Sequence, residues 1–158
     1  VLKGATLFMR AGARSSDSGV NQTIIQAIKN VNETIKFFDS ELRDHFQKEE
    51  EGLFPPLEKR LAKDGSPIAR MLAEHQEMWQ KIAEFRKAAG ALPSDGQNVA
   101  PKVADDVERV ASELIRLLRA HIEKENTILF PLVTANLSAE ELAEVKTRWS
   151  SLENVATH

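Results

Sequence analysis

The stretch HFQKEEEGLFP at residues 45–55 recurs as HIEKENTILFP at residues 121–131, with every shared residue at the same offset. In each copy a glutamate follows a histidine by four residues, which gives the pairs His45 and Glu49, and His121 and Glu125. Residues four apart lie on one face of an α-helix, about one turn apart. Each copy therefore predicts a helix that presents an imidazole and a carboxylate in the same direction.

The rest of the chain predicts an all-α protein. Loop-forming residues separate blocks that have the apolar periodicity of helices, and no block alternates with the period of a strand. A chain of 158 residues fits one domain with its own core. Four helices joined by short loops favour an up-down-up-down four-helix bundle, to which we add a short additional C-terminal helix.

Prolines and capping residues predict the helix boundaries. The second helix is expected to stop near Phe54, because a residue that precedes proline, here Pro55, is pushed out of the helical region. Ser66 followed by Pro67 predicts the start of the third helix. The other expected boundaries are a first helix from residue 1 to about 14, an end of the third helix near Gly90, a start of the fourth near Pro101, and a last helix opened by a capping box of Ser138 and Glu141.

A third internal histidine, His75, lies on the predicted third helix. In an antiparallel bundle it is expected level with the two paired histidines, roughly 12 to 15 Å from one pole. The alternative for each histidine is a core imidazole satisfied by a local hydrogen bond. The two glutamates favour a metal, because burying an ionised carboxylate is unfavourable by roughly several kcal/mol unless a cation compensates. The sequence therefore predicts a metal site made from His45, Glu49, His75, His121 and Glu125.

Three neighbouring acids are predicted to lie outside this site. Glu50 and Glu51 turn away from His45 by further steps of about 100° each, so we expect them on a solvated face. Glu74 is expected to face solvent, with a supporting contact to a metal ligand as the alternative. Nearby aromatic side chains are expected to act as core that excludes water, namely Phe46, Phe54 and Phe130.

Composition excludes several classes of function. The net charge of −3 and the mixed signs along the chain provide no basic patch, so we expect no nucleic-acid partner. No apolar run is long enough to cross a bilayer, so we expect no membrane partner and a cytoplasmic location. The chain has no cysteine and no tyrosine, so a bound metal must use nitrogen and oxygen ligands and a tyrosyl radical is excluded.

The doubled motif His-x3-Glu-x3-Leu-Phe-Pro, with a lone histidine between its copies, resembles the hemerythrin-like, or HHE, cation-binding family. The resemblance covers essentially the whole chain and implies a single hemerythrin-like domain over residues 1–158 that holds a non-haem di-iron centre. It implies that Glu49 and Glu125 bridge two iron ions and that the histidines are terminal ligands. Zinc and manganese stay open as alternatives, since they accept the same nitrogen and oxygen donors.

The resemblance also implies a function. We expect reversible binding or sensing of a small diatomic ligand, oxygen or nitric oxide, or iron handling, with any protein partner left open. Two alternatives are an enzyme that acts on peroxide or nitric oxide at the same irons, and a metal-free helical interaction module. His75 precedes the histidine of the second copy, His121, but no histidine holds the equivalent place before His45. The same spacing counted back from His45 reaches a position before Val1. We therefore expect the first helix to start upstream and to supply a further ligand.

Overall fold

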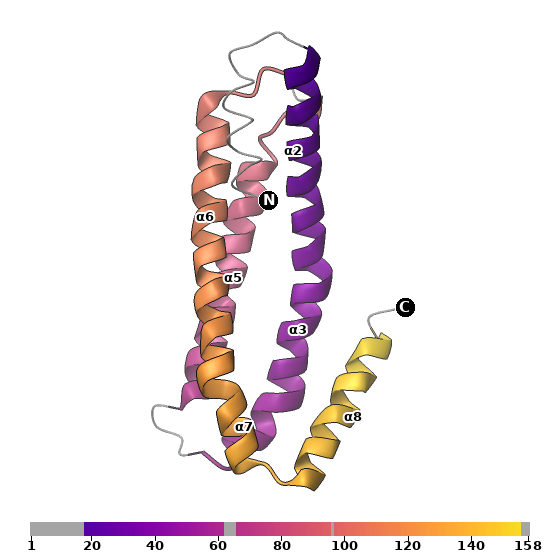
Figure 1. The fold of residues 1–158 in the computed structure, drawn as a ribbon, viewed down its shortest axis with the longest axis vertical. Coiled ribbons are helices and arrows are strands. Elements are labelled where there is room, and N and C mark those ends of the chain that lie inside the picture. Colours follow the sequence, from indigo (N-terminus) through magenta and orange to yellow (C-terminus); the bar gives the residue numbers. More distant parts are fainter. Residues whose placement is uncertain (1–17, 62–65, 96, 156–158) are drawn as a thin grey trace. The chain divides into compact units, whose positions relative to one another are not determined.

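A computed structural model describes residues 18–61, 66–95 and 97–155. Within these ranges the regular structure is helical and includes no strand, which confirms the all-α prediction (Figure 1). The up-down-up-down order of a four-helix bundle stays a prediction. The predicted first helix, from residue 1 to about 14, lies outside the described residues.

Helical hydrogen bonding runs unbroken from residue 18 to 58 and again from 101 to 136, because π-helical segments (η) join the α-helices end to end. The segments are α2 (Ser18–Phe37), η1 (Phe38–Leu42), α3 (Arg43–Gln47), η2 (Lys48–Leu53), α4 (Phe54–Glu58), α5 (Pro67–Ala89), α6 (Pro101–Lys124), η3 (Glu125–Leu129), α7 (Phe130–Asn136) and α8 (Ala139–Val155).

The predicted caps are confirmed. Ser66 Oγ accepts a hydrogen bond from the Ile68 N–H at 3.2 Å, at the start of α5. Ser138 Oγ accepts from the Glu141 N–H at 3.2 Å, and Glu141 Oε2 accepts from the Ser138 N–H at 2.8 Å. These two bonds form the reciprocal capping box expected before the last helix. That helix is longer than the short one predicted, since α8 has 17 residues.

The predicted stop of the second helix near Phe54 is wrong. The helix continues to Glu58, and Phe54, the residue before Pro55, keeps a helical ψ of −42°. The π-helical segment η2 lies immediately before the prolines, and its hydrogen bonds reach the fifth residue back instead of the fourth. Pro55 and Pro56 then lie in the first turn of α4, where their fixed φ suits a helix although neither can donate an N–H to the preceding segment.

The chain groups into two compact units. Unit 1 comprises Val1–Phe38 and Met78–Leu117, and unit 2 comprises Asp39–Glu77 and Leu118–His158. Every residue of the predicted metal site belongs to unit 2. The single domain over residues 1–158 stays a prediction.

Unit 1 has a core of apolar side chains at helical spacing. Its buried side chains from α2, α5 and α6 include Ile24, Ile28, Val31, Ile82, Phe85, Val107, Val110 and Leu114. The ring of Phe38 meets that of Phe85 edge to face, with 6.3 Å between the ring centroids. At the rim, Lys81 Nζ donates to Glu113 Oε2 at 2.8 Å. The apolar stripes read from the sequence are therefore buried as expected.

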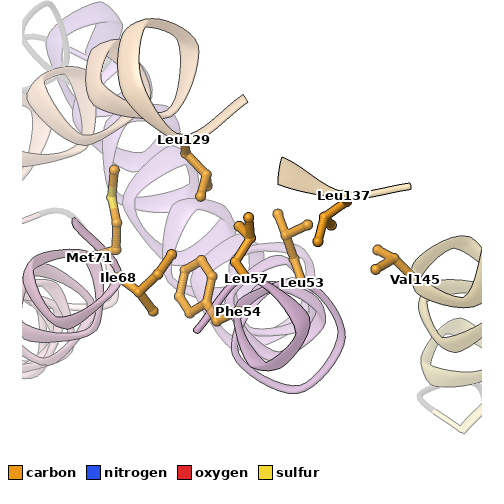
Figure 2. Close-up of a cluster of buried hydrophobic side chains, with 8 residues drawn as sticks. All are labelled: Leu53, Phe54, Leu57, Ile68, Met71, Leu129, Leu137 and Val145. Atoms are coloured by element: carbon orange, nitrogen blue, oxygen red, sulfur yellow. The ribbon is translucent and has the colours of Figure 1, made fainter. Parts of the chain in front are cut away.

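Unit 2 has a core that gathers both copies of the repeated motif. Leu53 and Leu129, the leucines of the two copies, lie in one buried cluster with Leu57 of α4 and Val145 of α8 (Figure 2). The full cluster is Leu53, Phe54, Leu57, Ile68, Met71, Leu129, Leu137 and Val145. Because α8 contacts η2 and adds Val145 to this cluster, the last helix covers the π-helical segment of the first copy (Figure 1).

We predict that replacing Leu57 with alanine lowers the free energy of unfolding by about 2–5 kcal/mol, because the side chain is fully buried and its removal leaves a cavity. Leu142→Ala on α8 is the control, since Leu142 is exposed and its truncation should change the free energy by less than about 0.5 kcal/mol. Urea unfolding followed by circular dichroism measures both values. Equal losses in the two variants would contradict this core.

Candidate metal centre

The five predicted ligands come from five segments of unit 2. Four of their side chains are buried, and the fifth, His45, is 36% exposed. The residues and their segments are His45 on α3, Glu49 on η2, His75 on α5, His121 on α6 and Glu125 on η3. The expectation that the two glutamates point inward is confirmed, because Glu49 is 1% exposed and Glu125 is 5% exposed.

The side chains converge as two triads that share Glu49. One triad is Glu49, His75 and His121, and the other is His45, Glu49 and Glu125; within each, one ligand atom per residue lies within 4.8 Å of the others. His75 Nε2 lies 3.3 Å from Glu49 Oε2. Glu125 Oε1 lies 3.1 Å from His121 Nε2 and 3.2 Å from His45 Nε2. Nitrogen and oxygen atoms thus face one small volume from several sides.

The Glu49 carboxylate lacks hydrogen-bond donors in this volume. Both of its oxygens are buried and neither accepts a hydrogen bond. Among the described residues, no lysine or arginine forms an ion pair with Glu49 or Glu125. A buried carboxylate without donors is strongly unfavourable unless a cation lies beside it. The donor set therefore fits a metal ion that Glu49 contacts.

In the metal-free protein, the carboxylates of the cluster raise the pKa values of two of its histidines, His45 and His121. The hydrogen bond to Glu125 raises the pKa of His45 despite the opposing effect of burial. Burial would lower the pKa of His121, but its hydrogen bonds to Glu125 and Glu74 outweigh burial and raise it. Burial would likewise raise the pKa of Glu125, yet the two histidines hold that pKa at about 2. A metal that binds these imidazoles must displace their protons.

Glu50 is exposed, as predicted, but it also contacts a predicted ligand, which the sequence analysis did not foresee. Its side chain is 39% exposed, but Oε1 lies 2.6 Å from Nδ1 of His75. The prediction assumed steps of 100° per residue, whereas Glu50 lies in the π-helical segment η2, which turns less per residue. Glu51 does stay exposed, as predicted, and accepts a hydrogen bond from Gln47 at 3.0 Å.

Glu74 departs from the solvent-facing prediction. Its side chain is 16% exposed, and its Oε2 lies 3.2 Å from Nδ1 of His121. Its other oxygen accepts a hydrogen bond from Lys124 Nζ. The alternative expectation of a supporting contact to a predicted ligand is therefore the one the structure favours. Sequence reasoning missed Lys124 altogether, although it is the shared lysine of the repeated motif.

Aromatic rings enclose one side of the cluster. The ring of Phe46 stacks on His75 with 3.8 Å between centroids and 9° between planes. Phe54 lies against the same histidine, at 5.8 Å between centroids. Both phenylalanines are buried, as predicted, whereas the expectation for Phe130 is wrong because that side chain is 44% exposed. The two buried rings keep water from His75.

Comparison with known proteins identifies the family. In the part of the chain that the structure describes, no helix is long and apolar enough to cross a membrane. Curated proteins and solved structures gave no match to this chain. A family model described as the Hemerythrin HHE cation binding domain matches residues 6–133. The chain therefore belongs to the hemerythrin family of HHE cation-binding domains, and cation binding is the function that this membership implies.

Proposed function

We propose that this cluster holds two iron ions and that the protein reversibly binds or senses oxygen or nitric oxide at them. The observation that carries the proposal is the Glu49 carboxylate, which is buried, accepts no hydrogen bond and belongs to both triads. A carboxylate has two oxygens, so it suits a bridge between two cations. Glu49 and Glu125 would bridge, and His45, His75 and His121 would be terminal ligands.

The chemistry of the donors supports iron. Imidazole and carboxylate ligands without thiolates suit iron, although zinc and manganese accept the same set. When bound, the iron pair would supply electrons to a small ligand, and the residues that would hold this pair are His45, Glu49, His75, His121 and Glu125. The protein's part is to hold the donors and exclude water, which Phe46 and Phe54 do on the His75 side. The half-exposed His45 marks the more open side of the cluster.

We predict that iron stabilises the fold. At a free metal concentration of about 100 times the dissociation constant, the free energy of unfolding should rise by about 2.7 kcal/mol. Glu49→Gln keeps the shape of the side chain but removes its charge, so most of this increase should be lost. Glu51→Gln, two residues along the same segment, should keep it, because Glu51 is exposed. Thermal unfolding with and without ferrous iron measures the effect; equal increases in both variants would contradict the ligand set.

We also predict opposite pH dependences for the metal-free and metal-loaded proteins. The pKa values of His45 and His121 are raised above 6.5, so their protons stabilise the metal-free fold fully below about pH 6.5, and this contribution disappears as pH rises through the raised values. Metal needs neutral imidazoles, so the stabilisation by metal should increase over the same range. Melting temperatures measured from about pH 6 to about pH 9 with and without metal test this. Parallel curves would refute it.

The function itself is tested by loading the protein with ferrous iron without oxygen and recording its visible spectrum before and after exposure to oxygen or nitric oxide. We expect new absorption that reverses when the gas is removed, with no net consumption of oxygen. Steady-state consumption of peroxide or nitric oxide would replace this proposal with an enzyme. Failure to retain iron, zinc or manganese would replace it with a metal-free interaction module.

A further inference from the structure

Both buried histidines of the cluster have a carboxylate at the ring nitrogen that faces away from the site. Glu50 Oε1 lies 2.6 Å from Nδ1 of His75, and Glu74 Oε2 lies 3.2 Å from Nδ1 of His121. Neither glutamate belongs to the triads. The two contacts place an acid behind each of the two imidazoles that are most deeply buried.

These contacts determine which nitrogen carries the proton. An ionised carboxylate only accepts hydrogen bonds, so Nδ1 of each histidine must donate and therefore holds a hydrogen. The Nε2 atoms of His75 and His121 lie 3.1 Å apart, and two N–H groups cannot point at each other at that distance. At least one Nε2 therefore has its lone pair free toward the centre, which is the form a metal ligand requires.

The two supporting glutamates differ in charge balance. Lys124 Nζ donates to Glu74, and Arg70 Nε lies 3.7 Å from the same carboxylate. Among the described residues, no lysine or arginine forms an ion pair with Glu50. The negative charge of Glu74 is therefore largely offset, whereas among the described residues no lysine or arginine offsets the charge of Glu50 beside His75.

We propose that Glu50 and Glu74 are positioning residues that orient the Nε2 lone pairs of His75 and His121, and that Glu50 strengthens His75 as a donor more than Glu74 strengthens His121. This inference rests on the proposed metal site. A full negative charge behind an imidazole raises its basicity toward a metal. Lys124, which is paired with Glu74, reduces this effect at His121. Two histidines with the same direct role thus receive unequal electronic support.

The test uses Co²⁺ titration of the full chain and the reduction potential of its iron-loaded form. Glu50→Gln keeps a hydrogen-bond acceptor but removes the charge, so Co²⁺ affinity should fall by about 10–100-fold. The same variant should raise the ferric/ferrous potential, because less negative charge near the metal stabilises the ferric form less. The matched control Glu51→Gln should change neither quantity. Metal-free circular dichroism checks that each variant folds.

The asymmetry is tested on the second carboxylate. Glu74→Gln should lower Co²⁺ affinity less than Glu50→Gln does, and Glu77→Gln, an exposed neighbour on α5, serves as its control. Replacing Lys124 with methionine removes the nearer balancing charge and leaves Arg70, so Glu74→Gln made in that background should lower affinity more than it does in the wild type. If the wild type binds Co²⁺ but Glu50→Gln matches Glu51→Gln, the inference fails while the metal site stands. If the wild type binds neither Co²⁺ nor iron, both fail.

Discussion

The buried carboxylate of Glu49 is the constraint around which unit 2 is organised. An acid with both oxygens buried and without a hydrogen bond is unstable in an apolar interior, so something positive must lie beside it. In the metal-free protein, hydrogen bonds to the neighbouring carboxylates raise the pKa values of His45 and His121, so these imidazoles keep a proton to higher pH than a free imidazole does. A metal ion provides the positive charge better, because it interacts with the carboxylate and with the imidazole lone pairs at once. Glu49 on this face therefore favours the binding of a cation and lowers the stability of the metal-free fold.

The π-helical segments explain why the repeated motif is longer than its ligands require. Glu49 lies in η2 and Glu125 begins η3, so both carboxylates expected to bridge are held in widened turns. Each segment ends at a leucine, Leu53 or Leu129, that is buried in one shared cluster. The prolines then fall in the first turns of the following helices, α4 and α7, where their fixed φ suits a helix. The Leu-Phe-Pro half of the motif therefore supports the His-x3-Glu half.

The sequence predicted which side chains cluster better than it predicted their surroundings. Residues four apart share a face in a regular helix. His45 and Glu49 still lie in one cluster, although the α-helix changes to a π-helix between them. Glu50 is exposed as predicted, but its contact with His75 was missed, because a residue inside a π-turn is rotated by a different angle from the one assumed. The phenylalanines show a second limit: Phe54 and Phe130 hold equal places in the repeat, yet one is buried and the other exposed. Local pattern predicts the direction of a side chain on its own helix, whereas burial depends on which segments pack against it.

The supporting carboxylates connect the segments of the cluster in chain order, from η2 to α5 and from α5 to α6. The local sequence does not reveal these contacts. Glu50 of η2 holds His75 of α5, and Glu74 of α5 holds His121 of α6. At the position equivalent to Glu50, the second copy has Asn126, which donates to the Ile122 carbonyl of its own helix at 2.9 Å. This position of the second copy therefore has no carboxylate to place behind another histidine, and His121 of that copy is instead supported from α5. Helix α5 both accepts and supplies a carboxylate contact, so its register affects both buried imidazoles. The lone histidine between the copies is thus the middle member of one connected set.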